Sequence, residues 1–295
     1  MDYIKKILAT IDDAIAGFQN DIPSIQKKLL DELQPLLKEL EIKDGKLLNN
    51  VKNLKLIGDV KNRLEKIILT GQYKDAVNTF IQSFDQVSSL QQNYFAQFNQ
   101  KYTPKKTLPL IKQLTIESTI NNLVGRGMLE NIIEPIRVIL MDNITSGGSY
   151  AKFQDQLRTA ILNDSTSDGS MVRYTKQITT DAINQYSAQY HETIAQDLQF
   201  NWGTYLGTNL TTSREFCLLL TKKEWVHKSE LPEIIKGYID GHKCKLSKTS
   251  GLPLGMIAGT NADNFKVVRG GYNCGHHFFW VPDSSVPDHI RSKFS

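Results

Sequence analysis

The sequence predicts a mainly α protein, with an elongated N-terminal helical region followed by a small α+β C-terminal module. Apolar residues recur at spacings of three and four along most of residues 1–198, which is typical of amphipathic helices. Aromatic and β-branched residues, which favour strands, gather after residue 199. All three cysteines also lie in this last part, after residue 216. We therefore expect helices to form the body and the final hundred residues to carry the distinctive chemistry.

The N-terminal region, residues 1–101, predicts a set of long helices. Over residues 2–42, apolar side chains repeat at helical spacing from Ile4 to Leu40. This pattern predicts two helices or one kinked helix, with Pro23 opening the second helix and Pro35 bending it. Two more helices are expected, over residues 51–69 and 73–101.

The middle region begins after a proline-containing boundary at residues 102–109. Four helices are expected beyond it, over residues 110–123, 128–144, 150–162 and 171–198. Pro135 predicts a kink in the second of these helices. His191 lies on the fourth helix, where an isolated histidine is usually solvated or hydrogen-bonded. The chain thus divides into an N-terminal helical region at 1–101, a helical middle region at 110–198 and a module at 199–295.

The C-terminal module predicts short elements of both kinds. Residues 200–207 alternate aromatic and small side chains, as a strand does. A short helix is expected over residues 214–220 with Ser213 as its cap, and another over residues 224–237. Residues 240–262 are rich in glycine and are expected to be irregular.

One stretch, residues 265–282, concentrates glycine, cysteine, histidine and aromatic residues. Val267 and Val268 have strand composition, as do residues 278–281. Residues 269–272 contain paired glycines and predict a turn between these two strands. Pro282 is expected to end the second strand.

Composition and charge exclude several classes of protein. Asp12 and Asp13 interrupt any apolar core of a signal peptide, and no apolar run is long enough for a membrane span. Three cysteines do not make a disulfide framework, so we expect reduced thiols in a chain made in the cytosol. The net charge of +4 comes from residues 211–295, which hold 12 Lys and Arg against 8 Asp and Glu. A solvated basic face explains a surplus this small, and contact with an anionic surface such as DNA is the alternative.

The cysteines and histidines of the module suggest a zinc site. Structural zinc takes four nitrogen or sulfur ligands, usually in closely spaced pairs. Cys274 and His276 offer one such pair, and Cys217 with Cys244 (or His242) would complete the set. The alternative is that Cys217 and Cys274 are small buried core residues that bind no metal.

Two kinds of catalytic site are alternatives to a zinc site. A nucleophilic thiol at Cys217 or Cys274 would need His276 or His277 within hydrogen-bond reach. A nuclease or toxin-like enzyme would centre on Asn273, His276 and His277. It would take its carboxylates from Glu224, Asp240 or Asp263. The sequence contains no phosphate loop and no dinucleotide fingerprint.

Two short elements resemble the phage Mu F-like head morphogenesis, or minor head protein, family. The first is an Arg-x-Phe-Cys element formed by Arg214, Phe216 and Cys217. The second is a Gly-Gly-Tyr-Asn-Cys-x-His element formed by Gly270, Gly271, Tyr272, Asn273, Cys274 and His276. The resemblance covers about residues 110–282 and leaves the helices at 1–101 outside it. The chain departs from the family pattern at Gly275, where a basic residue is common, and it adds His277.

The resemblance implies a structural, non-enzymatic role. Family members are minor virion proteins associated with the portal or the capsid interior, where they act in head morphogenesis and in DNA packaging or delivery. It implies the portal or the major capsid protein as partners, packaged DNA as a further contact, several copies per virion and no membrane. Synthesis would take place in the cytoplasm of a bacterial host, and no cofactor is implied beyond the candidate structural zinc.

Overall fold

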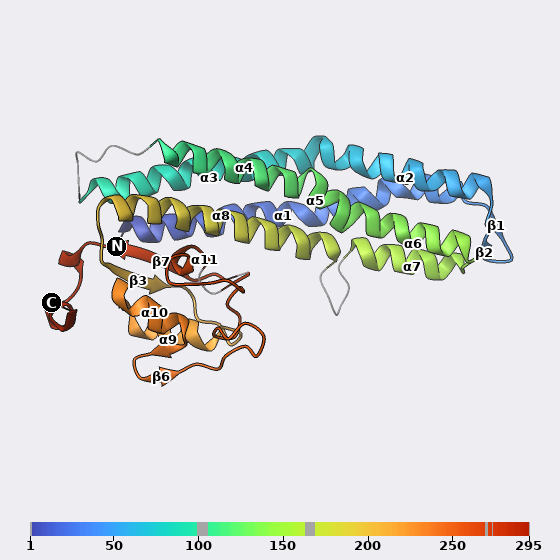
Figure 1. Cartoon of the computed structure of the whole chain (residues 1–295). Helices are drawn as coiled ribbons and strands as arrows, with labels where there is room; N and C mark the ends of the chain where they lie inside the picture. The colour runs from blue at the N-terminus through green and yellow to red at the C-terminus, as the bar shows by residue number, and fades with distance from the viewer. Residues whose placement is uncertain (1, 99–105, 163–168, 269–270, 273, 295) are drawn as a thin grey trace. The chain divides into compact units, whose positions relative to one another are not determined.

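The computed structural model describes residues 2–98, 106–162, 169–268, 271–272 and 274–294. Figure 1 shows the order of the elements along the chain by colour. The chain forms two compact units. Unit 1 consists of Met1–Ile11, Phe84–Thr115 and Thr180–Ser295, and unit 2 consists of Asp12–Ser83 and Ile116–Thr179. Each unit therefore draws on separated stretches of chain, whereas the sequence was divided into three consecutive ranges, 1–101, 110–198 and 199–295.

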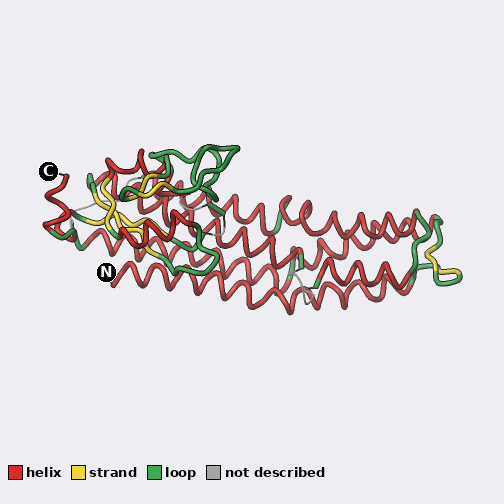
Figure 2. Tube along the Cα trace, turned by 90° about the horizontal axis from the view of Figure 1, so that it is seen from below, coloured by secondary structure: helices red, strands yellow, loops and turns green. Residues whose placement is uncertain are grey.

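The protein is mainly α, as predicted, with a long helical N-terminal part and short strands toward the C-terminus. Figure 2 shows most of the strand segments, in yellow, within the C-terminal part of the chain. The long helices are α1 (Asp2–Lys38), α2 (Val51–Leu69), α3 (Gly71–Ala96), α4 (Thr107–Leu123) and α8 (Ser170–Asp197). The predicted boundary at residues 102–109 lies partly outside the described residues, and α4 already begins at Thr107.

The first helix decides between the two alternatives expected from the sequence, because α1 is a single helix that contains both Pro23 and Pro35. Proline inside a helix removes one backbone hydrogen bond and disfavours the helix. Burial explains why the helix continues, since Ile22 and Ile25 on either side of Pro23 are both about 1% exposed or less. The apolar face of the helix thus outweighs the local preference of the proline.

Unit 2 is built from helices and one small hairpin. Besides its parts of the long helices it contains α5 (Arg126–Met128), α6 (Glu134–Thr145) and α7 (Tyr150–Ile161), and the hairpin strands β1 (Ile42–Lys43) and β2 (Lys46–Leu47). Helix α6 packs against both α2 and α7. An aromatic cluster fills part of the core, where the ring of Phe18 lies 6.0 Å from that of Tyr73 and 5.7 Å from that of Phe80. Tyr73 also donates a hydrogen bond of 2.8 Å to the carbonyl of Leu123.

A π-helical turn, Leu129–Ile133, lies between α5 and α6. Pro135 follows it in the first turn of α6, a position that suits proline because the first backbone N–H groups of a helix have no partner within the helix. The wide π-helical turn precedes the proline, and the kink expected from Pro135 stays a prediction.

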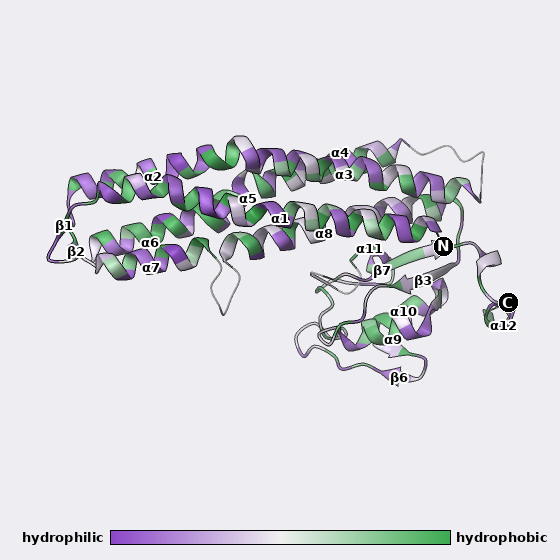
Figure 3. Cartoon of the chain, turned by 180° about the vertical axis from the view of Figure 1, so that it is seen from behind, coloured by the Kyte–Doolittle hydropathy of each residue, from purple (hydrophilic) through white to green (hydrophobic). Residues whose placement is uncertain are grey.

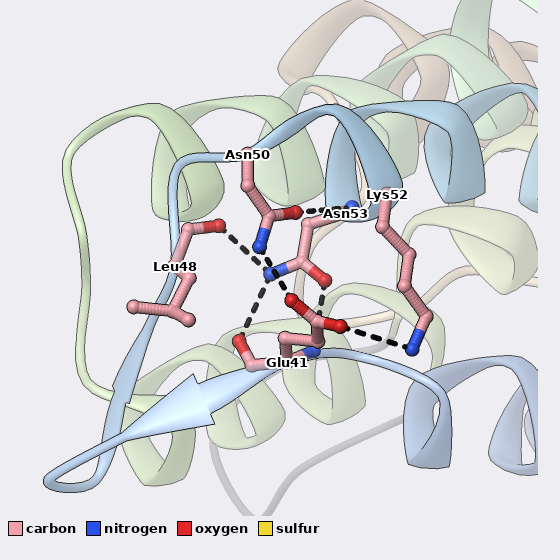
Figure 4. Close-up of polar contacts among 5 residues, drawn as sticks. All are labelled: Glu41, Leu48, Asn50, Lys52 and Asn53. Carbon is pink, nitrogen blue, oxygen red and sulfur yellow. Dashed lines mark hydrogen bonds and ion pairs between the residues drawn. The ribbon is translucent and has the colours of Figure 1, made fainter.

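Asn53 ties the hairpin of unit 2 to the start of α2 (Figure 4). Its side-chain amide donates to the carbonyls of Glu41, at 2.9 Å, and Leu48, at 2.8 Å, and its side-chain oxygen accepts from the backbone N–H of Glu41 at 2.8 Å. Asn50 caps α2 by accepting from the N–H of Asn53 at 2.9 Å. The carboxylate of Glu41 in turn binds the side chains of Asn50 and Lys52. One fully buried amide thus adds side-chain hydrogen bonds to three backbone groups beside the hairpin.

Unit 1 contains the three-stranded antiparallel sheet, in the order β4-β3-β7. Its strands are β3 (Trp202–Leu206), β4 (Trp225–His227) and β7 (His277–Val281). Helices α9 (Glu215–Lys223), α10 (Leu231–Ile235), α11 (Phe265–Val268) and α12 (Asp288–Arg291), and the two-residue strands β5 (Tyr238–Ile239) and β6 (His242–Lys243), complete the unit. Strand β7 is buried along its whole length. Tyr94 of α3 donates a hydrogen bond of 2.8 Å to the carbonyl of Trp280, which holds β7 against that helix.

Three local expectations for the C-terminal module were wrong. Residues 265–268 form α11 where a strand was expected, because Asn261 and Asn264 make hydrogen bonds of 2.8 to 3.0 Å that start a helix. A helix was expected over the whole of residues 224–237, but the first part of this range forms strand β4, which pairs with β3. Ser213 does not cap α9; its hydroxyl accepts from the N–H of Leu210. The strands expected at 200–207 and 278–281 are present as β3 and β7.

Figure 3 shows that hydrophobic and hydrophilic residues alternate around the helices, as the sequence pattern indicates. Among the described residues, none of the helices combines the length and the apolar character that a membrane crossing requires.

Candidate functional site

The candidate site lies in unit 1, where the ends of β3 and β7 meet the start of α9. Strands β3 and β7 pair antiparallel with Leu206 opposite His277. The end of β3 therefore lies beside the start of β7, and the residues just before β7 are brought to the same place. Helix α9 then begins at Glu215, which puts Cys217 in its first turn. Residues that are far apart in the sequence thus come together because of sheet pairing.

Three side chains with metal-binding atoms meet at this place. The sulfurs of Cys217 and Cys274 and a ring nitrogen of His276 all lie within 4.8 Å of one another, and all three residues are buried. The Cys274 sulfur lies 3.8 Å from Nδ1 of His276. Cys217, Cys244 and Cys274 are all in the thiol form.

Tyr205 of β3 contributes a fourth polar atom. Its hydroxyl lies 3.4 Å from the sulfur of Cys217 and 4.0 Å from that of Cys274. Its ring stacks on the ring of His276, with centroids 5.5 Å apart and planes 10° apart. Tyr205 is fully buried, so its ring and hydroxyl form one wall of the site.

The ring of His276 is oriented by a second contact. Its Nε2 lies 3.2 Å from the side-chain oxygen of Asn209. An amide oxygen only accepts hydrogen bonds, so Nε2 carries the proton and Nδ1 presents a lone pair toward Cys274. Gly207 makes room for the ring, because a Cβ at that position would lie 2.6 Å from the His276 side chain.

Arg214 connects the two sequence elements through the loop before Cys274. Its guanidinium donates a hydrogen bond of 2.9 Å to the carbonyl of Tyr272. Gly255 and Gly271 pack closely around it. A Cβ on Gly255 would lie 2.1 Å from Nε of Arg214, and one on Gly271 would lie 2.1 Å from the carbonyl oxygen of Gly255. Both glycines also have positive φ, 89° and 96°, so they are required by conformation as well as by space.

The thiol of Cys217 is poorly suited to nucleophilic catalysis. A hydrogen bond with the Cys274 thiol and, next, burial raise the pKa of Cys217 well above its ordinary value. A nucleophilic cysteine needs a lowered pKa, because the thiolate is the reactive form. Independently of this pKa, the two sulfurs and the ring nitrogen lie within 4.8 Å of one another, and such a set of donor atoms suits a soft cation.

The other predicted residues have separate places. Phe216 is buried in the core beside Cys217. Cys244 is buried, but it does not belong to the group formed by Cys217, Cys274 and His276. His242 is exposed and pairs with Glu215 at 3.0 Å. Gly270 and Asn273 lie outside the described residues.

The nuclease hypothesis drew on carboxylates that the structure places elsewhere. Asp240 forms an ion pair of 2.5 Å with Lys223, and Glu224 and Asp263 are not members of the group around His276. His277 is buried in β7 with its ring 5.9 Å from that of Phe279. Within the part of the chain that the structure describes, the group around His276 contains no carboxylate.

Sequence reasoning missed Tyr205 and Asn209. Neither is close in sequence to a cysteine, and neither is an ordinary zinc ligand. The alternating pattern of residues 200–207 predicted the strand that holds Tyr205, but not what the strand lies beside. Only the pairing of β3 with β7 reveals both contacts.

No protein-family model, no curated protein and no solved structure matches the chain. The resemblance described under Sequence analysis therefore depends on the quoted residues alone.

Proposed function

We propose that the chain is a bacteriophage minor head protein. In this role it is a structural component of the virion, associated with the portal or the capsid interior. It acts in head morphogenesis and in the packaging or delivery of DNA. It has no enzymatic activity of its own, and it is present in several copies per virion.

One observation carries this proposal. The two elements that resemble the family are separated by more than fifty residues, yet their described members come together in unit 1, with Cys217, Cys274 and His276 buried. Arg214 binds the carbonyl of Tyr272, and Cys217 meets Cys274 and His276. The motif residues therefore have a shared structural purpose, which is what a packing motif in an assembly protein requires.

A partner protein would be bound through apolar side chains on α4. Leu110 and Leu114 lie one helical turn apart and are 51% and 55% exposed. Residues at this spacing share one face of a helix. We propose that the portal or the major capsid protein buries this face, because burying the exposed halves of these two leucines contributes about 1.5 to 3 kcal/mol to association.

Packaged DNA would be contacted by lysines of the C-terminal segment. Lys243, Lys245 and Lys248 are all exposed and lie within six residues of one another. They belong to the segment that holds the whole positive surplus of the chain. Such a group neutralises phosphates without reading the base sequence.

The experiment for the head role is mass spectrometry and crosslinking of purified virions from the phage or prophage that encodes the chain. We expect the chain in the virion, crosslinked to portal or major capsid protein. The double variant Leu110→Asp/Leu114→Asp should be lost from virions, whereas Thr211→Asp/Thr212→Asp, which adds two carboxylates on an exposed turn, should not. Virions that lack the wild-type chain while the lysate contains it would overturn the proposal.

The DNA contact is tested separately by fluorescence anisotropy with a random-sequence duplex at several salt concentrations. Changing Lys243, Lys245 and Lys248 to Gln should weaken binding and reduce the salt slope by about 3 units. The control changes three exposed lysines elsewhere, Lys5, Lys27 and Lys28, and should leave the slope close to that of the wild type. Equal slopes in both triple variants would exclude this surface as the DNA contact.

A further inference from the structure

We propose that unit 1 binds a zinc ion through the sulfurs of Cys217 and Cys274 and Nδ1 of His276. This inference does not depend on the proposed role in the phage head. The proposed ligand set differs from the one expected from the sequence, because it does not include Cys244. Tyr205 lies on the fourth side of the ion instead.

The distances between the three ligand atoms suit a tetrahedral zinc. Zn–S bonds of about 2.3 Å and Zn–N bonds of about 2.0 Å place neighbouring ligands of a tetrahedron about 3.5 to 3.8 Å apart. The observed separation of Cys274 Sγ and His276 Nδ1 is 3.8 Å, and the largest separation in the group is within 4.8 Å. Small side-chain rotations would therefore suffice to close the site around an ion.

Contacts with neighbouring side chains orient His276 for coordination. Asn209 accepts a hydrogen bond from Nε2 of His276, which leaves the lone pair of Nδ1 directed toward Cys274. Histidine ligands of zinc ordinarily donate their other N–H to a carbonyl or carboxylate in this way. The stacked ring of Tyr205 holds the imidazole plane.

Tyr205 defines the fourth side of the site. Its hydroxyl lies at 3.4 Å and 4.0 Å from the two sulfurs, which is close to the spacing of a fourth vertex. This hydroxyl either completes the coordination or donates a hydrogen bond to a coordinated thiolate. In both cases the hydroxyl that faces the two sulfurs belongs to a fully buried residue.

Charge balance favours zinc in this buried position. Binding of Zn²⁺ would form two Zn–S bonds and one Zn–N bond and release the two thiol protons to solvent. Two thiolates and one divalent cation give a neutral centre, which costs little to bury compared with an isolated ion. Thiolate and imidazole ligands together select zinc over hard cations such as Mg²⁺ and Ca²⁺.

The experiment is elemental analysis of the full-length chain purified under reducing conditions from zinc-supplied cells. We expect one zinc per chain in the wild type and loss of zinc in Cys217→Ser and Cys274→Ser. Cys244→Ser removes a buried cysteine outside the group, so it is the matched control and should retain the metal. Loss of zinc in the control as well as in the ligand variants would overturn the assignment.

Two further measurements keep the test independent of folding defects. Asn209 is exposed, so Asn209→Ala should fold normally. It should bind zinc about 10- to 100-fold more weakly, because His276 loses the hydrogen bond that orients its ring. Cobalt added to the metal-free wild type should give thiolate-to-cobalt charge-transfer absorption and the strong visible bands of a tetrahedral site. A wild-type chain without zinc that shows no cobalt spectrum, or that carries a Cys217–Cys274 disulfide under these conditions, would overturn the proposal.

Discussion

Nε2 of His191 accepts a hydrogen bond of 2.9 Å from the backbone N–H of Trp280. On the other side of the ring, Nδ1 lies 2.7 Å from the side-chain oxygen of Gln91. The imidazole therefore carries its proton on Nδ1 and is neutral, since a protonated ring could not accept from Trp280. Burial lowers the pKa of His191 from 6.5 to about 3. A helical histidine expected to be solvated or hydrogen-bonded is thus a fully buried link between α8 and β7.

The first prediction concerns acid lability. The unfolded chain takes up a proton on this histidine near pH 6.5, whereas the folded chain does so only near pH 3. Between these values the unfolded chain binds more protons, so the stability that the neutral ring provides is complete above pH 6.5 and falls as the pH is lowered. The slope should approach about 1.4 kcal/mol per pH unit from this residue alone.

Urea unfolding between pH 7.5 and pH 4.5 measures this effect. His191→Gln removes the titrating ring, so the stability advantage of the wild type over this variant should shrink as the pH falls. His289→Gln changes an exposed histidine and should follow the wild type at every pH. A difference between wild type and His191→Gln that stays constant with pH would contradict the assignment.

A second prediction concerns the buried ion pair of Glu192 and Lys266. Their charged groups lie 2.9 Å apart, and the side chains are only 9% and 11% exposed. The indole N–H of Trp280 donates to the same carboxylate. Lys266→Met would leave that carboxylate buried without its cation and should cost about 3 to 5 kcal/mol of unfolding free energy.

A double-mutant cycle separates the pair from its surroundings. Glu192→Gln/Lys266→Met removes both charges, so it should be more stable than Lys266→Met alone. The surface pair of Lys236 and Glu233, both more than half exposed, supplies the control. Lys236→Met should have little effect on stability in the same denaturation assay. Equal losses of stability at the two sites would show that burial of the Glu192–Lys266 pair does not increase its contribution to stability.

A third prediction concerns Asn53, whose amide group satisfies three backbone groups of Glu41 and Leu48. Asn53→Asp keeps the size of the side chain but removes both N–H donors and places a carboxylate against two carbonyls. The change should reduce the unfolding free energy by more than about 2 kcal/mol. Asn62→Asp makes the same change at an exposed position of the same helix and should have little effect. Similar thermal unfolding of the two variants would argue against the role of Asn53.

The helices of this protein were predictable because their apolar periodicity is strong and continuous. The strands β3 and β7 were predictable from alternation and aromatic content. The predictions were less accurate at positions where two structural preferences of the sequence competed. Pro23 suggested an interruption, but buried neighbours carry α1 through it. Val267 and Val268 suggested a strand, but the asparagine turns before them start a helix.

The candidate site was predictable only in its residue types. The sequence suggested Cys217, Cys274 and His276 as candidate metal ligands, but it grouped Cys244 with them because spacing alone does not rank distant cysteines. Their meeting depends on pairing between β3 and β7, a contact between segments about seventy residues apart. The same pairing places Tyr205 and Asn209 in the site, so no local sequence motif predicts their presence there.

The last prediction concerns Gly203 in β3, where the absence of a side chain makes room for a ring of β7. A Cβ at Gly203 would lie 2.2 Å from the ring of Phe278, which is itself buried. Gly203→Ala should therefore cost about 1 to 3 kcal/mol, as overpacking of a core does. Gly58 lies on the exposed side of α2 with open space around it, so Gly58→Ala should stabilise the protein by up to about 1 kcal/mol. Adding Phe278→Leu to Gly203→Ala should recover part of the loss, because the clash is between these two residues. Thermal denaturation of the four chains would refute the argument if both alanine substitutions shifted stability in the same direction.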